Sequence, residues 1–352
     1  MSRADRLAAA LEVDALLITN LVNLRYVTGF TGSNGIAVVG RDIRRFITDF
    51  RYVEQAADQV DGFDNELAPR EVSDVLDDGW PDGPFRLGFE DQHVSVRRHA
   101  RLRELLPERV ELVAAGGTVE QLRAVKDAGE VERIRAAAAL VDEVYGTLRE
   151  QGLVGRTERE VALAIELELR RLGAEELSFP SIVASAERGA LPHAEPADEP
   201  IPRGTLVTLD IGARLDGYCS DCTRTWATGE LPDDLADAYA LVQRAQAESL
   251  AAVRPGPEGR EVDAVARRII EDAGHGDHFG HGLGHGVGLE IHEAPRLARA
   301  AEGALVAGNV VTVEPGVYLP GRGGVRIEDL VVVTEDGHSV VSGTTKDLVT
   351  VD

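Results

Sequence analysis

The chain has 352 residues, a formal net charge of −24 and 43% hydrophobic residues. This length suits two domains, and the apolar content supports a sizeable core and argues against global disorder. The negative charge argues against nucleic acid or an anionic membrane as a partner, and no apolar run reaches transmembrane length.

The first residues favour a cytoplasmic protein. They read M-S-R-A-D-R-L-A-A-A-L-E-V-D, with acidic residues where a signal peptide needs an uninterrupted apolar core. Nearly all basic residues are arginines, since Lys126 and Lys346 are the only lysines. We attribute this bias to genome composition rather than to mechanism.

Short strands and helices alternate in the first third of the chain and predict an α/β domain over residues 1–117. After an opening helix we expect strands at 14–19, 36–39, 44–48 and 85–89, and helices at 51–59 and 95–106. Gly116 and Gly117 then mark a boundary, and Thr118 opens a capping box with Gln121.

The remainder, residues 118–352, predicts an α+β domain with two similar halves. Each half reads as two helices followed by a hairpin, without obvious sequence repetition between the halves. The expected helices are 130–149, 157–172, 235–252 and 261–273, and the expected hairpin strands are 205–213 with 218–227 and 309–317 with 324–334.

Each hairpin carries two acids inside strand-like runs: Asp210 and Asp221 in the first, Glu314 and Glu328 in the second. Ionised carboxylates that face one another repel, so we expect positive charge between them. For any single acid the alternative is an ordinary salt bridge, as Glu328 could form with the nearby Arg326.

The stretch from 280 to 293 reads G-H-G-L-G-H-G-V-G-L-E-I-H-E and carries His281, His285 and His292. Glycines let the backbone approach a metal or substrate closely, although a mobile surface loop with incidental histidines is the alternative. Four carboxylates and one imidazole suit Mn²⁺, Co²⁺ or Zn²⁺ in an open catalytic centre. Their four negative charges match two divalent cations, which make hydroxide available for hydrolysis near neutral pH.

Other motifs lack the context that they need. The pair in C-S-D-C, Cys219 and Cys222, falls in a strand rather than at a helix N-terminus, so we interpret both as ordinary reduced side chains. The glycines at 282–288 follow a helix and not a strand, which excludes a dinucleotide-binding loop, and no G-x-S-x-G motif occurs.

Taken together, D-I-G-A-R-L-D-G-Y-C-S-D-C-T-R-T (210–225), H-G-L-G-H-G-V-G-L-E-I-H-E (281–293), T-V-E-P-G-V-Y (312–318) and G-V-R-I-E-D (324–329) resemble the pita-bread metallopeptidases. V-N-L-R-Y-V-T-G-F-T-G-S-N-G (22–35) and T-D-F-R-Y (48–52) resemble the N-terminal domain of the aminopeptidase P and prolidase branch. The resemblance implies a creatinase-like α/β domain followed by an α+β pita-bread catalytic domain with two pseudo-symmetric halves.

The resemblance also implies roles for individual residues. Asp210 would bind one metal, Asp221 and Glu328 would bridge both, and His285 and Glu314 would complete the other. Glu314 would also move the proton. The expected substrate-binding residues are His193, His281, His292 and Arg326, with His281 and His292 also catalytic. His193 would help to close the pocket, and Arg326 would orient Glu328.

The implied activity is that of a dinuclear, metal-dependent exopeptidase, an Xaa-Pro aminopeptidase or Xaa-Pro dipeptidase, with two divalent ions per subunit and Mn²⁺ as the first choice. Small proline-containing peptides would be the substrates. The alternatives are a non-catalytic pita-bread binding protein and a creatinase-like C–N hydrolase, although creatinase lacks the metal ligands found here.

The resemblance further implies a homodimer in which one subunit's N-terminal domain approaches the other's active site. Arg51 and the loop 30–34 are the candidates for that approach, although Arg51 could instead form a salt bridge within its own domain. Two features depart from the family pattern: Phe50 stands where relatives often have glycine, and extra acids and prolines surround His193.

Overall fold

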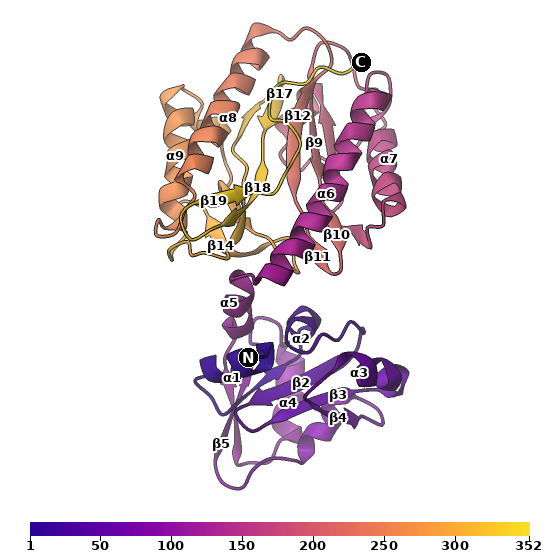
Figure 1. The fold of residues 1–352 in the computed structure, drawn as a ribbon, viewed down its shortest axis with the longest axis vertical. Helices are drawn as coiled ribbons and strands as arrows, with labels where there is room; N and C mark the ends of the chain where they lie inside the picture. The colour runs from indigo at the N-terminus through magenta and orange to yellow at the C-terminus, as the bar shows by residue number, and fades with distance from the viewer. The chain divides into compact units, whose positions relative to one another are not determined.

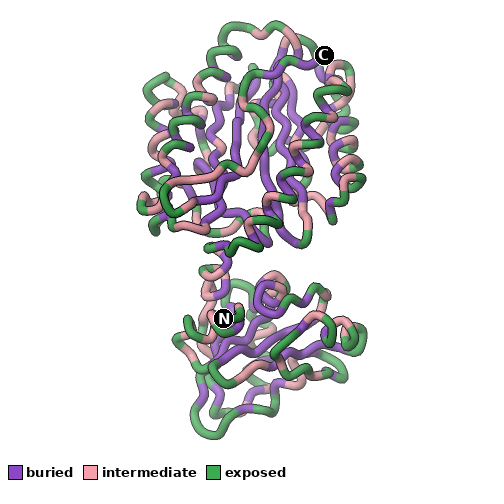
Figure 2. The backbone as a smooth tube through the Cα atoms, viewed as in Figure 1, coloured by how far each residue is buried: buried purple, intermediate pink, exposed green.

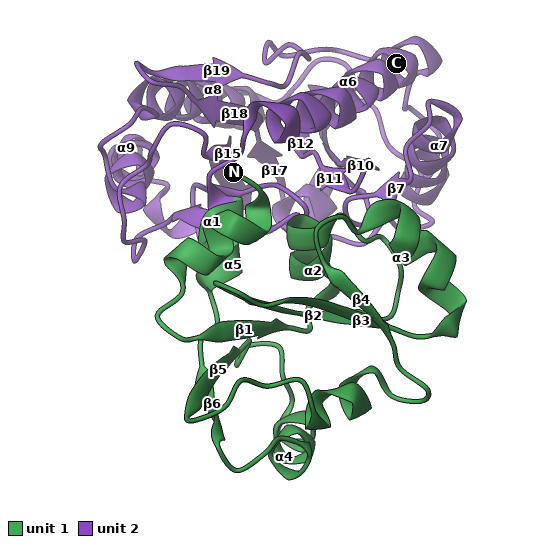
Figure 3. Cartoon of the chain, turned by 60° about the horizontal axis from the view of Figure 1, so that its bottom comes forward, with its two compact units in different colours: residues 1–123 green, residues 124–352 purple.

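The computed structural model describes residues 1–352 and contains two compact units, Met1–Arg123 and Ala124–Asp352 (Figure 3). The division falls one helix beyond the boundary expected after Gly117. The helix concerned, α5 (Thr118–Ala124), bonds to the first unit, since Tyr26 Oη donates to the Leu122 carbonyl over 3.2 Å. A capping-box signature locates the start of a helix but not the unit against which the helix packs.

The first unit is built on one mixed sheet of six strands in the order β4-β3-β2-β1-β5-β6. Its elements are α1 (Arg3–Ala10), β1 (Ala15–Ile18), α2 (Leu21–Thr28), β2 (Gly35–Gly40), β3 (Arg44–Thr48), η1 (Phe50–Tyr52), α3 (Val53–Gln59), β4 (Asp64–Leu67), η2 (Val72–Asp77), β5 (Phe85–Phe89), α4 (Val96–Leu105) and β6 (Val110–Ala114). The expected hairpin is confirmed, because β2 pairs antiparallel with β3. The edge strands β4 and β6 were not expected from the sequence.

A buried carboxylate joins the central strands to α2. Glu90 directly follows β5 and is 3% exposed. Its Oε2 accepts hydrogen bonds from the backbone N–H groups of Thr19 (2.6 Å) and Asn20 (2.7 Å), and its Oε1 accepts from Asn23 Nδ2 (2.7 Å). The start of α2 therefore depends on this side chain.

We expect Glu90→Ala to lower the free energy of unfolding by about 3 kcal/mol, because several buried donors lose their acceptor at once. Urea denaturation followed by circular dichroism measures this change. Glu90→Gln keeps the side-chain volume and one acceptor oxygen, so it should cost less. An alanine variant as stable as the glutamine variant would contradict this role of the carboxylate.

The second unit has the two halves expected from the sequence. The first half contains α6 (Ala128–Gln151), α7 (Glu158–Arg171), β7 (Glu176–Leu177), β8 (Ile182–Ser185), η3 (Ala186–Ala190), β9 (Leu206–Ile211), β10 (Ala213–Leu215), β11 (Tyr218–Cys219) and β12 (Cys222–Ala227). The second half contains α8 (Asp233–Ala252), α9 (Gly259–Asp272), η4 (Gly276–His278), β13 (Gly284–Gly286), β14 (Glu293–Leu297), β15 (Val310–Val313), β16 (Gly316–Leu319), β17 (Gly323–Arg326), β18 (Asp329–Val333) and β19 (His338–Val340). All four predicted helices are confirmed.

Figure 1 shows α6 and α7 on one side of the strands and α8 and α9 on the other. Each pair of helices has its own core. Val144, Ile165 and Leu209 belong to the core of the first half, and Val242, Ile270 and Val331 to that of the second. Burial is concentrated in the strands between the helix pairs, as the purple segments in Figure 2 show. Most of the strand positions in this layer therefore face protein on both sides.

The four expected hairpin strands are each interrupted. The first breaks at Gly212, and each of the other three has a two-residue break that contains an acid: Asp221 between β11 and β12, Glu314 between β15 and β16, and Glu328 between β17 and β18. At two breaks the backbone bonds elsewhere, because Glu314 N donates to Leu283 O (2.8 Å) and Glu328 N to Thr223 O (3.1 Å). The second of these bonds connects the two halves.

Candidate metal centre and active site

Three of the predicted ligands meet in the interior. One carboxylate oxygen from each of Asp210, Asp221 and Glu328 lies within 4.8 Å of the others, and all three residues are buried. The other two predicted ligands adjoin this group. His285 Nε2 lies 3.3 Å from Glu314 Oε1 and 3.6 Å from Asp221 Oδ2. The structure therefore brings all five predicted ligands together.

The acids are poorly compensated by the protein alone. Burial, followed by the charge of the neighbouring carboxylates, raises the pKa of Asp221 and of Glu328 well above the ordinary range. Burial also raises the pKa of Glu314 to about 7. Asp210 Oδ1 and Glu328 Oε1 are buried without a hydrogen-bond partner. Buried polar atoms are rarely left unpaired, so this group fits divalent cations.

The imidazole of His285 is neutral and faces two of the acids. Burial lowers the pKa of His285 to about 4, so its ring is neutral. Its Nδ1 lies 3.0 Å from the Gly286 carbonyl, which can only accept, so Nδ1 carries the proton. Nε2 then presents a lone pair toward the carboxylates of Glu314 and Asp221. A cation between these atoms would turn repulsion into attraction.

Arg326 supplies positive charge next to Asp210. Its Nη2 donates to Asp210 Oδ2 over 2.6 Å, and its Nε donates to Thr223 Oγ1 over 3.0 Å. The Thr223 hydroxyl in turn donates to Glu328 Oε2 over 2.8 Å. Arg326 therefore contacts Asp210 directly and reaches Glu328, the carboxylate it was expected to orient, through Thr223. One guanidinium offsets only part of four carboxylates.

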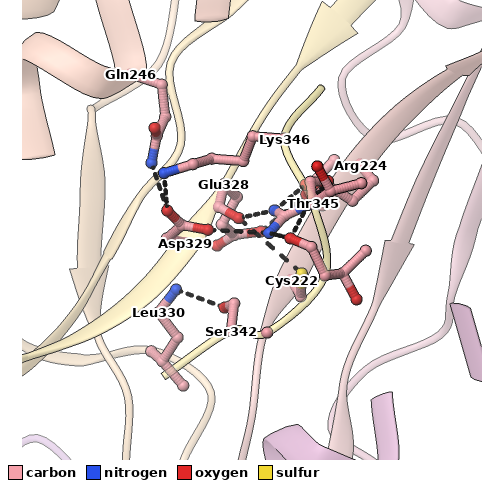
Figure 4. Close-up of polar contacts among 12 residues, drawn as sticks. Cys222, Arg224, Gln246, Glu328, Asp329, Leu330, Ser342, Thr345 and Lys346 are labelled. Carbon is pink, nitrogen blue, oxygen red and sulfur yellow. Dashed lines mark hydrogen bonds and ion pairs between the residues drawn. The ribbon is translucent and has the colours of Figure 1, made fainter. Parts of the chain in front are cut away.

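Behind Glu328 lies a second charged cluster, drawn in Figure 4. Its centre is Asp329, whose Oδ1 accepts from Arg224 Nη2 (2.9 Å) and whose Oδ2 accepts from Gln246 Nε2 (3.0 Å) and from Lys346. Arg224 also donates to the Glu328 carbonyl. The backbone directly after Glu328 is thus fixed by buried charge.

The remaining predicted residues line the same cavity of about 490 Å³. Its polar wall contains His193, His281, His292 and Arg326 together with the four acids and the His285 imidazole described above. Phe179, Ile182 and Ile291 belong to its apolar wall. His193 and His292 are exposed, whereas His281 is half-buried. The His292 ring meets that of His285 edge-on, with 4.4 Å between centroids.

Tyr318 is a cavity residue to which the sequence analysis gave no role. Its hydroxyl lies 2.9 Å from His281 Nε2 and accepts from Arg326 Nη1 over 3.1 Å. His281 Nδ1 faces the Gly282 carbonyl at 2.7 Å and must donate to it, so Nε2 accepts from the tyrosine. Both nitrogens of His281 are therefore engaged. Tyr318 lay within the T-V-E-P-G-V-Y motif, but nothing local showed its partner.

Two buried acids hold the loops that carry the histidines. On α9, Asp263 Oδ1 accepts from Leu283 N (3.0 Å) and its partner Arg267 donates to the carbonyls of Phe279 and His281. On α7, Glu158 accepts from Ser185 N (2.7 Å), Arg188 Nε (2.8 Å) and Ala197 N (3.0 Å). The first set fixes the loop before β13, and the second fixes both ends of the segment that carries His193.

Outside the cavity, Arg51 forms a salt bridge within its own unit and the two cysteines are ordinary reduced side chains. Arg51 pairs with Asp49 inside the first unit, with 2.8 Å between Nη2 and Oδ2. Cys219 and Cys222 are both free and buried, and burial raises the pKa of the Cys219 thiol to about 11. No helix combines the length and apolar character needed to span a membrane.

Comparison with known proteins identifies the class. Residues 132–335 match the model of metallopeptidase family M24, and residues 1–125 match the creatinase/prolidase N-terminal domain. The chain belongs to metallopeptidase family M24, in its aminopeptidase P and prolidase branch. The expected fold, a creatinase-like domain followed by a pita-bread domain, is confirmed.

Individual relatives cover nearly the whole chain. An uncharacterized peptidase, YqhT, from Bacillus subtilis is 42% identical over 350 residues, 99% of each protein. The structure of an Xaa-Pro dipeptidase from Bacillus anthracis has a TM-score of 0.96 at 38% identity, covering 99% of both chains. That of an X-Pro aminopeptidase from Thermotoga maritima has a TM-score of 0.91 at 34% identity, covering 99% of this chain and 100% of the other.

We expect the metal-stripped protein to lose stability as pH rises from about 4.5 through about 7. The pKa of Glu314 is about 7 in the folded protein against an ordinary value of 4.5, so the folded state binds the extra proton in that window. A divalent cation replaces the proton and should abolish the loss. Calorimetric melting temperatures with chelator and with Mn²⁺ across this range measure both effects.

The matched control is Glu314→Gln, which cannot titrate at this position and should show a flatter dependence in the stripped form. If the stripped parent protein became more stable over this pH range, or if Mn²⁺ left its melting temperature unchanged at every pH, the assignment of these acids as a cation site would be wrong.

Proposed function

We propose that this chain is a dinuclear, metal-dependent exopeptidase that hydrolyses the Xaa-Pro bond at the N-terminus of peptides or in Xaa-Pro dipeptides. The observation that carries the proposal is one cavity in which three buried carboxylates, the half-buried Glu314 and a neutral imidazole adjoin three further histidines. The dipeptidase and aminopeptidase names of relatives that match 99% of the chain support it.

In this proposal Asp210 would hold one ion, His285 and Glu314 would hold the other, and Asp221 and Glu328 would serve both. Mn²⁺ is the first choice and Co²⁺ or Zn²⁺ the alternatives, because oxygen and imidazole ligands suit all three. Divalent ions held there would polarise the scissile carbonyl and lower the pKa of water toward neutrality.

Glu314 is the proposed proton carrier. Hydrolysis must take a proton from the attacking water and deliver one to the leaving proline nitrogen. Glu314 lines the cavity, and its Oε1 lies 3.3 Å from His285 Nε2, so its carboxyl group is within reach of the proposed reaction centre for both steps. Thr312 Oγ1 donates to Glu314 Oε1 over 3.0 Å and holds the carboxyl in place.

The polar groups at the rim are proposed to stabilise the negative charge that develops on the carbonyl oxygen. His292 and His193 are exposed at the cavity and can donate directly. His281 acts together with Tyr318, because its own nitrogens are already engaged. Arg326 also donates to the Pro192 carbonyl over 3.1 Å and thereby steadies the neighbouring His193.

The apolar wall suits a proline ring. An Xaa-Pro bond is a tertiary amide whose nitrogen has no hydrogen to donate, so recognition must use ring contacts instead. Phe179, Pro180 and Ile182 supply apolar surface in the same cavity as Asp210, and Ile182 pairs with Asp210 in the sheet. The proline would therefore lie next to the metal ligands.

Turnover of Ala-Pro, Ala-Pro-Ala and Ala-Ala-Ala tests the substrate class. We expect cleavage of at least one proline peptide and little cleavage of Ala-Ala-Ala. The preference between the first two separates a dipeptidase from an aminopeptidase. Equal cleavage of Ala-Ala-Ala would refute proline specificity. Absence of all turnover in the metal-loaded protein would favour a non-catalytic or creatinase-like role.

His292→Ala should lower kcat about a hundredfold while the metal content stays near that of the parent protein, because a lost donor to the developing charge costs about that factor. Asp221→Asn should instead lower metal content and activity together. Metal analysis of both variants beside their kinetics measures the difference. Equal metal loss in both variants would contradict the separate roles.

We further propose a cytoplasmic homodimer in which the N-terminal domain of one subunit approaches the active site of the other. The two free cysteines support the location. Phe50 is 79% exposed beside Arg51, which leaves apolar surface on this part of the first unit. Sedimentation showing only monomer at micromolar concentration would rule out the dimer.

A further inference from the structure

The two lysines have similar surroundings in the structure. Among 37 basic residues only Lys126 and Lys346 are lysines. Each forms an ion pair with an acidic residue that directly follows a proposed site residue in the sequence. Lys126 pairs with Glu293, which follows His292, and Lys346 pairs with Asp329, which follows Glu328 (Figure 4). This shared placement goes beyond the composition bias to which we first attributed the lysines.

We propose that Lys126 and Glu293 are a positioning pair, which sets the loop between His285 and His292 and through it the His292 imidazole. The inference rests on the proposed function for its kinetic consequence, but the pair itself is defined by geometry. Nζ lies 3.0 Å from Oε2, and the two side chains are 1% and 5% exposed.

The loop is folded around the Glu293 carboxylate. Glu293 Oε1 accepts from Glu290 N over 3.1 Å, and Gly288 N donates to the Glu290 carbonyl over 3.0 Å. The carboxylate also packs against Gly288 so closely that a Cβ there would lie 2.5 Å from Oε2. The position of the carboxylate therefore determines the path of the chain just before His292.

Lys126 is held independently of this loop. Its backbone N–H donates to the Gly308 carbonyl over 2.8 Å. Gly308 has a φ of +92° and approaches so closely that a Cβ there would lie 3.0 Å from the Lys126 carbonyl oxygen. Because the Lys126 backbone is held by Gly308 and not by the loop, the ammonium keeps its position and attracts the Glu293 carboxylate to it.

The effect of the pair reaches the proposed centre through the His292 ring. The far side of the loop is anchored, because its Gly288 carbonyl accepts from Cys219 N over 2.8 Å. The His292 ring rests on that of His285. Removing one partner of a buried ion pair is strongly destabilising, so the loop would move without Lys126.

Arginine should not replace this lysine. The guanidinium is a planar fork, larger than the compact ammonium, and the lysine side chain is 1% exposed. Lys126→Arg keeps the charge but not the shape, whereas Lys126→Met keeps the approximate shape but not the charge. Both should displace the loop if the position of Glu293 is what matters.

A double-mutant cycle tests the inference. We expect Lys126→Met to lower kcat at least about tenfold with metal content unchanged, since a misplacement of about 1 Å can cost up to a hundredfold. In the His292→Ala variant, adding Lys126→Met should lower kcat little further, because the pair acts through His292. Arg322→Met is the control, since it breaks an exposed pair with Asp234.

An equal loss from Lys126→Met in both backgrounds would show that the pair acts independently of His292 and would overturn the inference. Full kcat in Lys126→Met would do the same. Glu293→Gln removes the charge from the other partner, and it should reproduce the pattern if the lysine variant does not fold.

A second measurement does not depend on turnover. The ring-proton NMR signal of His292, identified by its loss in His292→Ala, should shift in Lys126→Met and stay in place in Arg322→Met. An unmoved signal in Lys126→Met would overturn the positioning role. If the parent protein cleaves no Xaa-Pro peptide, the proposed function fails, and this signal still decides the inference.

Discussion

The buried negative charge at the meeting of the two halves is the constraint on which the rest of the catalytic unit depends. Burying one uncompensated carboxylate is costly, and here four share one cavity with a single close guanidinium. The two halves therefore have to meet accurately. The Glu328–Thr223 backbone bond and the Arg326–Asp210 pair both cross between them. Cations bound among these acids would add to the stability of the same contact.

The sequence predicted the acids and their strands because period-two alternation is a local signal. It did not predict the interruptions beside three of the acids. Pro315, directly after Glu314, could have indicated one of them, since proline cannot donate to a ladder. C-S-D-C-T carries no comparable signal, and beside Asp221 the backbone bonds to distant residues, since Cys219 N donates to the Gly288 carbonyl. The edge strand β4, D-N-E-L, was not predicted because it is largely exposed and lacks the alternation of apolar and polar residues.

The candidate site was predictable as a set of residue types but not as a network. His281 and Tyr318 are 37 positions apart, and Lys126 and Glu293 are 167 apart. Contacts over such sequence separations produce no periodic pattern, so they cannot be predicted from a single sequence. The general role expected for Arg326 illustrates the limit. Its nearness to Glu328 in the chain suggested a direct contact, whereas the fold places Asp210 closer and leaves Thr223 as the link to Glu328.

Neighbouring residues in an extended chain point to opposite faces, and this alternation explains why charge is found on both sides of the site. Glu328 faces the cavity, so the next residue, Asp329, faces away and needs Arg224, Gln246 and Lys346. His292 lines the cavity, and Glu293 pairs with Lys126 in the same way. Where the residue next to a cavity residue is also charged, its side chain lies on the outer face and needs a partner of opposite charge there. These outer pairs fix the backbone from behind, so the positions of the inner groups depend on residues that never contact a substrate.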